Sequence, residues 1–392
     1  MADNKDKKVL NVPHLRFPEF SGEWEKCSIQ DYGEVVTGNT PPTSHAEYYE
    51  DGSYLWASPA DLGINKNITE TKTKLSLSGF KKTRSIPKGS VLVTCIGSTI
   101  GKMGMAAETM SSNQQINSIV VNDKSNSDFV YYAICRAFPR YLSEVAVQAV
   151  PILSKSNFEK LPNYTTCRDE QDKIGYFLNL LDERIATQNK IIEDLKLLRD
   201  AITERLYSEV NGTVYTYHQL FDVINERNKD NVYNNVLSAS QELGMIDRSD
   251  INIDIKFEQA SIVSYKIVRK GDYVVHLRSF QGGFAFSEKT GICSPAYTIL
   301  RPNDNLIYGY LSHYFTSKQF VKSLKLVTYG IRDGRSINVD EWLDMKVAIP
   351  EKQVQSHILT TINSIGCRLR NEDKIYSRLI KQKSYLLRQM FI

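Results

Sequence analysis

Long apolar runs are missing from this sequence. None approaches the roughly 18 consecutive apolar residues that a membrane-spanning helix requires. A hydrophobic share of 41% with a charged share of 24% is typical of globular chains. Residues 1–8 are polar and lack the apolar core of a secretion signal. These absences predict a cytoplasmic protein in which residues 1–12 form a disordered tail.

Motifs for metal binding and for disulfide bonds are also missing. The six cysteines are scattered without a C-x-x-C pair, and the six histidines form no pair at the spacing of metal ligands on a helix. We therefore expect no bound metal, and reduced cysteines that serve in packing. The cysteines are Cys27, Cys95, Cys135, Cys167, Cys293 and Cys367.

Signatures of nucleotide-binding and methyl-transfer enzymes are absent as well. The stretch from Gly97 to Lys102 differs from a P-loop, because Met103 stands where the magnesium-binding Ser or Thr belongs. Residues 40–43 (TPPT) lack the Asp or Asn and the aromatic residue that flank two prolines in amino-methyltransferases. We expect a chain without a catalytic centre; the alternative is a nuclease site made of scattered carboxylates and lysines.

Charge and aromatic content do not distinguish a nucleic-acid-binding protein from other globular proteins. The net charge of +4 and the 22 tyrosines suit contacts with nucleic acid. The same charge occurs in many proteins that never bind nucleic acid, and tyrosine also suits strands and cores.

What the sequence does contain is an internal repeat. Residues 158–207 reappear as residues 342–391, a shift of roughly 184 positions. In both copies apolar residues follow alternating steps of three and four, which predicts two helices of about 35 residues, or roughly 50 Å each. Ile174, Asn179, Arg184, Lys190, Ile191 and Leu195 recur unchanged as Ile358, Asn363, Arg368, Lys374, Ile375 and Leu379.

A long helix with a narrow apolar stripe needs a partner. The nearest partner is the other copy, so we predict an intramolecular antiparallel coiled coil. The alternatives are that each helix packs on its own domain, or that it pairs with a helix of another chain.

The segments between the helices echo each other weakly. Residues 88–93 (KGSVLV) resemble residues 270–275 (KGDYVV), each a turn followed by a buried strand. The pattern predicts an α+β fold, a pseudo-two-fold tandem repeat of two mixed α/β domains separated by the two long helices. The expected boundaries are 1–12 for the tail, 13–162 for the first domain, 163–210 for the first helix segment, 211–347 for the second domain and 348–392 for the second helix segment.

Over nearly its whole length the chain resembles the specificity subunits of type I restriction-modification enzymes. The resemblance is carried by residues 13–24 (PHLRFPEFSGEW), by residues 36–42 (VTGNTPP) and by Glu170-Gln171 ahead of the first helix. It implies two target recognition domains, each binding one half of a bipartite site in double-stranded DNA. It also implies two methylation subunits docked on the helices and restriction subunits outside them. S-adenosylmethionine, ATP and Mg are then bound by those partners and not by this chain.

Candidate DNA-binding residues of the first domain lie in three polar loops and at one lysine. The loop at residues 38–42 offers two hydrogen-bonding tips, and residues 97–102 offer backbone N–H groups and a lysine for a phosphate. An amide cluster at residues 113–115 suits adenine. The alternatives are an ordinary turn, a tight hairpin and a strand cap, respectively. The candidates are Asn39, Thr40, Ser98, Thr99, Lys102, Asn113, Gln114, Gln115 and Lys155.

The second domain carries different candidates at corresponding places. A polar stretch follows the strand equivalent to residues 91–95, and residues 329–335 (YGIRDGR) combine an aromatic residue with two arginines. The alternative for the latter is a solvated charged turn. The candidates are His276, Arg278, Ser279, Gln281, Tyr329, Arg332 and Arg335. Because the two sets differ, the two domains are expected to bind different sequences. The other interpretation of the whole chain is a scaffold that spaces two interaction modules by a coiled coil.

Overall fold

A computed structural model describes residues 10–145, 152–240, 243–250, 259–276, 283–329 and 336–392. The chain divides into two compact units. The first unit comprises residues 1–189 together with 374–392, and the second comprises residues 190–373. Each unit therefore contains part of both long helices and one of the two domains predicted from the sequence.

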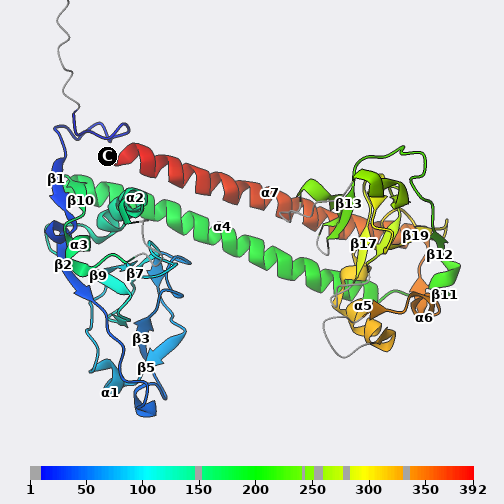
Figure 1. The fold of residues 1–392 in the computed structure, drawn as a ribbon, viewed down its shortest axis with the longest axis horizontal. Helices are drawn as coiled ribbons and strands as arrows, with labels where there is room; N and C mark the ends of the chain where they lie inside the picture. The colour runs from blue at the N-terminus through cyan, green and yellow to red at the C-terminus, as the bar shows by residue number, and fades with distance from the viewer. Residues whose placement is uncertain (1–9, 146–151, 241–242, 251–258, 277–282, 330–335) are drawn as a thin grey trace, which may run out of the picture. The chain divides into compact units, whose positions relative to one another are not determined.

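The domain in the first unit is a mixed α and β structure (Figure 1). Its strands are β1 (Glu25–Ser28), β2 (Gly33–Thr37), β3 (Tyr54–Ala57), β4 (Asn67–Ile68), β5 (Thr73–Leu75), β6 (Val91–Thr94), β7 (Met103–Ala106), β8 (Ser111–Ser112), β9 (Ile116–Val121) and β10 (Pro162–Thr165). Its helices are α1 (Leu77–Phe80), α2 (Ser127–Val145) and α3 (Lys155–Glu159). The strands form a sheet of order β2-β9-β6-β7-β4 and a smaller sheet of order β5-β3-β8, while β1 pairs with β10. Helix α2 packs against β6 and β7 and supplies much of the core.

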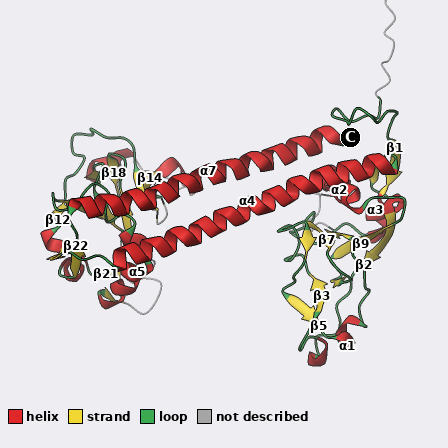
Figure 2. Ribbon diagram, turned by 180° about the vertical axis from the view of Figure 1, so that it is seen from behind, coloured by secondary structure: helices red, strands yellow, loops and turns green. Residues whose placement is uncertain are grey.

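The domain in the second unit repeats this plan with shorter elements (Figure 2). Its strands are β11 (Thr213–Thr216), β12 (Phe221–Ile224), β13 (Leu237–Ser240), β14 (Gly244–Asp247), β15 (Lys266–Val268), β16 (Tyr273–Val275), β17 (Phe284–Phe286), β18 (Gly291–Cys293), β19 (Thr298–Pro302), β20 (Thr328–Tyr329), β21 (Ser336–Ile337) and β22 (Lys346–Ile349). Its helices are α5 (Lys318–Ser323) and α6 (Val339–Leu343). The sheet order β12-β19-β16-β17 matches β2-β9-β6-β7, and the β11 and β22 pair matches β1 and β10. The α+β tandem repeat predicted from the sequence is therefore present.

The two long helices are α4 (Arg168–Ser208) and α7 (Lys352–Met390). Each begins a few residues later than the predicted helix segments, which start at residues 163 and 348. The reason is the same in both copies, because β10 and β22 occupy those residues and pair with the strand that opens each domain. Neither strand was predicted from the sequence.

Within each unit the start of one helix packs beside the end of the other. In the first unit Leu178 and Leu181 of α4 share a core with Leu386 of α7. In the second unit Tyr207 of α4 shares a core with Ile362 of α7.

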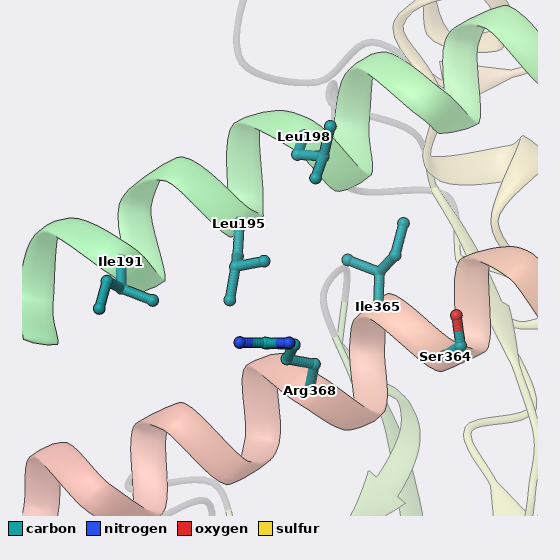
Figure 3. Close-up of a pocket in the computed structure, with 6 residues that line it drawn as sticks. All are labelled: Ile191, Leu195, Leu198, Ser364, Ile365 and Arg368. Atoms are coloured by element: carbon teal, nitrogen blue, oxygen red, sulfur yellow. The ribbon is translucent and has the colours of Figure 1, made fainter.

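In the second unit, apolar side chains of the two helices also face each other across a hollow, and this row of apolar contacts is called the apolar seam (Figure 3). Side chains of α4 at Ile191, Leu195 and Leu198 line it from one side, and Ser364, Ile365 and Arg368 of α7 line it from the other. The polar Arg368 interrupts the seam and also forms an ion pair along its own helix with Glu372.

The structure corrects two smaller expectations. The cysteines do not all serve in packing, because Cys167 and Cys367 are exposed. Burial raises the pKa of Cys95 and of Cys293 to about 12, as expected of packing residues. The predicted tail is also too long, since the Asn11 backbone accepts a hydrogen bond from the Trp24 N–H and its own N–H donates to Glu23.

Two kinds of feature are absent from the described residues. No helix in these ranges is both long and apolar enough to cross a bilayer. The same part of the chain holds no cluster of three or more His, Cys, Asp and Glu side chains placed to bind a metal ion.

Candidate nucleic-acid interface

One end of the five-stranded sheet collects almost all the predicted residues of the first domain. Neighbouring strands are antiparallel there, with Thr37 opposite Asn117 and Thr94 opposite Ile116. The end of β2, the turn from β6 to β7 and the start of β9 therefore lie at the same edge. The structure thus brings together Asn39, Thr40, Ser98, Thr99, Lys102, Asn113, Gln114 and Gln115.

Two exposed side chains of this edge are joined to each other. The Thr40 hydroxyl donates a hydrogen bond to the Gln114 side-chain carbonyl at 2.5 Å. Both residues are exposed. A side-chain amide in the open can pair with adenine through its carbonyl and its NH₂ group. This pair has the chemistry of a base-reading group.

The neighbouring Asn39 is used differently. Its amide donates to the Lys82 carbonyl at 2.9 Å, and its side-chain carbonyl accepts from the Arg84 N–H at 2.8 Å. Its backbone carbonyl accepts from the Trp56 indole. Binding a base with this amide would require breaking two hydrogen bonds to the backbone.

Asn113 and Gln115 also hold the loops together. Asn113 is only 8% exposed, and its side-chain carbonyl accepts the Gln115 N–H. The Gln115 amide reaches across to the Ile96 carbonyl at 3.4 Å. Of the predicted amide cluster, Gln114 is the member that faces solvent.

The turn that carries Ser98, Thr99 and Lys102 is a tight hairpin connection. Gly97 and Gly101 have φ values of +98° and +90°, which favour glycine. A Cβ atom at Gly101 would also lie 2.7 Å from the Phe138 ring. The hairpin interpretation therefore accounts for both glycines, while Ser98 and Lys102 remain exposed at its tip.

Lys155 lies close to this edge along the chain. Ile152 forms a β-bridge with Ile96, and Lys155 follows at the start of α3. It is exposed, and its ammonium lies 3.5 Å from Glu159.

In the second domain the corresponding turn leaves β16 at His276. The His276 N–H donates to the Gly283 carbonyl, as Thr94 donates to Lys102 in the first domain. The imidazole is half-buried, its pKa is lowered by burial, and within the described residues its Nε2 atom has no hydrogen-bond partner. Tyr329 lies in β20, which pairs with β21. The predicted Arg278, Ser279, Gln281, Arg332 and Arg335 lie outside the described residues.

A pair of buried glutamines anchors each domain to its long helix, although the sequence indicated Gln171 only through the family resemblance and gave neither glutamine this role. The Gln171 side chain accepts the Asn126 N–H at 2.9 Å and donates to the Thr166 carbonyl. Gln355, at the matching place in the repeat, accepts the Ile307 N–H and donates to two carbonyls. These side chains tie each domain to the first turn of a long helix. The repeat itself was the signal that could have revealed them.

An ionic network gives the first unit a second anchor. The Lys66 ammonium lies 2.5 Å from Asp128 and 2.7 Å from the Asn179 side-chain carbonyl of α4. One turn further along α4, Asp182 pairs with Lys383 of α7 at 2.5 Å. The repeat places Gly366 at the position of Asp182, so the second unit cannot form the same pair.

Comparison with known proteins finds similarity to one family in part of the chain. Residues 21–197 match the family described as "Type I restriction modification DNA specificity domain". The HindI specificity subunit of Haemophilus influenzae is 29% identical over 201 residues, which are 49% of this chain and 42% of that protein. The MjaIX specificity subunit of Methanocaldococcus jannaschii is 30% identical over 190 residues, 45% of this chain and 42% of that protein. Each match thus spans less than half of the relative's length.

Two solved structures have the same fold along nearly the whole chain. The S subunit of a type I restriction-modification system from M. genitalium aligns with a TM-score of 0.59 and 16% identity, covering 97% of this chain and 99% of that one. A chain from a study of complex assembly and conformational transition of the type I R-M system aligns with a TM-score of 0.59 and 13% identity, covering 96% and 98%.

Proposed function

We propose that the chain is a specificity subunit of a type I restriction-modification enzyme and that it binds a bipartite DNA sequence. Each domain contacts one half-site with the loops at one end of its sheet. The chain itself has no catalytic centre.

One observation carries this proposal. Two sheets of matching strand order end in loops of different chemistry. The first domain presents Thr40, Gln114 and Lys102, whereas His276 is the described residue at the corresponding turn of the second domain. A common scaffold with different tips suits the recognition of two different half-sites.

We further propose that α4 and α7 pair along their length as an antiparallel coiled coil that sets the spacing between the half-sites. The apolar contacts between the two helices within each unit support this pairing. A pseudo-two-fold repeat offers two equivalent docking faces, so two methylation subunits bind and restriction subunits attach outside them. These partners bind S-adenosylmethionine, ATP and Mg, and the complex works in the cytoplasm.

A methylation assay with the purified chain tests the absence of catalysis. We expect no methyl transfer by the chain alone and transfer when the methylation subunit is added. Activity of the lone chain would refute the non-catalytic assignment. DNA binding without any salt dependence would instead support a scaffold that does not engage phosphates.

Domain exchange tests the division of labour. Replacing about residues 15–160 by the first domain of another specificity subunit should change one half-site only. Genome-wide mapping of methylated adenines gives the recognised sequence before and after the exchange. A change in both half-sites would show that the domains do not act independently.

A further inference from the structure

We propose that residues 81–84 of the first domain (KKTR) form a phosphate-binding loop beside its half-site, and that Asn39 is the residue that positions this loop. The inference rests on the proposed function and assigns to Asn39 a role different from base reading. The partner is the sugar-phosphate backbone of double-stranded DNA.

Asn39 holds this loop in place through hydrogen bonds to its backbone. Its side-chain NH₂ group donates to the Lys82 carbonyl, and its side-chain carbonyl accepts from the Arg84 N–H. One amide thus satisfies two backbone groups of the loop. The Arg84 guanidinium adds a third link, because it donates to the Thr37 carbonyl at 2.8 Å. Thr37 is the last residue of β2, and the loop is thereby fixed to the same sheet edge as Thr40 and Gln114.

The loop presents positive charge without internal neutralisation. Lys81, Lys82 and Arg84 are exposed, and among the described residues none of them forms an ion pair. Three cations within four residues, on a loop held to the scaffold by three hydrogen bonds, suit a run of phosphates. The contact adds affinity for any sequence and places the reading side chains against the bases.

The second domain has a different sequence at the matching place. Because residues 270–275 match residues 88–93, residues 81–84 correspond to residues 263–266 (VSYK), which contain one cation instead of three. That cation, Lys266, donates a hydrogen bond to the Tyr297 carbonyl at 2.8 Å.

The test measures DNA affinity of the full chain assembled with its methylation subunits. Fluorescence anisotropy follows binding to a duplex carrying the mapped target and to one with a scrambled first half-site, at salt concentrations from about 50 to 200 mM. For the double variant Lys81→Ala/Lys82→Ala we expect the slope of log affinity against log salt to shrink by about 0.9 for each phosphate that the loop no longer neutralises. Both duplexes should bind more weakly by the same factor.

Lys88→Ala is the matched control. Lys88 is also an exposed lysine of this domain, but it precedes β6 and lies at the opposite end of the sheet. Its substitution should leave the slope unchanged. An unchanged slope in the Lys81→Ala/Lys82→Ala variant, with normal target preference, would overturn the loop assignment.

Asn39→Ala separates positioning from reading. A positioning residue predicts weaker binding to every duplex, with the same preference among single-base variants of the target. Loss of discrimination at one base pair would show that Asn39 reads that base. If the unaltered complex fails to prefer its target over the scrambled duplex, the proposed function fails and not this inference alone.

Discussion

Single residues fix each domain to its long helix, and the two buried glutamines show this most clearly. Gln171 and Gln355 are 2% and 1% exposed and use both ends of their amides. Replacing either by leucine leaves a partly buried backbone N–H of the domain without its acceptor, which costs about 1–3 kcal/mol. Thermal unfolding should therefore shift to lower temperature in Gln171→Leu and in Gln355→Leu.

The same helix supplies the control for this prediction. Gln353 lies two residues before Gln355 and is exposed. Gln353→Leu should leave the unfolding temperature nearly unchanged. Equal destabilisation by Gln353→Leu and Gln355→Leu would mean that the buried hydrogen bonds contribute nothing specific.

A histidine gives the second unit its own pH dependence. Burial lowers the pKa of His313 below its ordinary value of 6.5, while its hydrogen bond to Asn363 at 2.9 Å and the charge of Glu288 oppose the shift and that of Arg199 adds to it. As the pH falls below 6.5 the unfolded chain binds a proton before the folded one does. The contribution to stability is therefore complete above that pH and is lost below it.

We expect this loss to diminish in His313→Gln, which keeps a donor for Asn363 but does not titrate. Unfolding temperatures measured between about pH 5 and pH 8 for both proteins give the comparison. His276, whose pKa is also lowered by burial, contributes in the same direction. Parallel curves for the two proteins would contradict the assignment to His313.

At this scale the sequence predicted candidate loops but not their arrangement. The loops that carry Thr40, Lys102 and Gln114 were each predicted from the sequence, whereas their meeting at one sheet edge follows from the strand order β2-β9-β6-β7. The role of Asn39 in positioning residues 81–84 could not be predicted from the sequence, because its hydrogen-bond partners lie 43 and 45 residues away in the chain. Hydrogen bonds to distant backbone atoms leave no local pattern.

Among the elements, the long helices were predictable from heptad spacing, but the ion pair that joins them in the first unit was not. The ion pair between Asp182 and Lys383 is partly buried, with side-chain exposures of 14% and 24%. Lys383→Met leaves the Asp182 carboxylate without its cation, and we expect a loss of about 2–4 kcal/mol in the first unit. Adding Asp182→Asn to this variant should recover part of the loss.

The repeat offers a matched control here as well. Arg199 is the counterpart of Lys383 in the other helix, and it pairs with Asp200 at the surface. Arg199→Met should cost at most about 1 kcal/mol. Denaturant unfolding of the single and double variants gives the coupling energy, and a value near zero would remove the pair from any role in joining the helices.

For the whole molecule, the spacing between half-sites is the property to test. The boundary between the two units falls after Asn189 in α4 and after Asp373 in α7, which are matching places in the repeat. Inserting one heptad at both places keeps the apolar seam in phase and lengthens each helix by about 10 Å at 1.5 Å per residue. The spacer, which is the stretch of base pairs between the two half-sites, should grow by about three base pairs, at roughly 3.4 Å each.

Methylation mapping reports the new spacer directly. Both half-sites should stay the same, because no loop of either domain is altered. A heptad added to α4 alone puts the two seams out of register and should abolish methylation. An unchanged spacer in the double insertion would show that the helices do not set the distance.

The first unit has one further property that follows from its discontinuous composition. Its core joins Trp24 and Phe129 to Phe391, with ring centroids 5.9 and 5.4 Å from that residue. Phe391 is translated long after Trp24 and Phe129, and only after the whole of the second domain. The first domain therefore keeps the aromatic surface that Phe391 covers exposed until the end of α7 has been translated. During synthesis the second domain can close before the first.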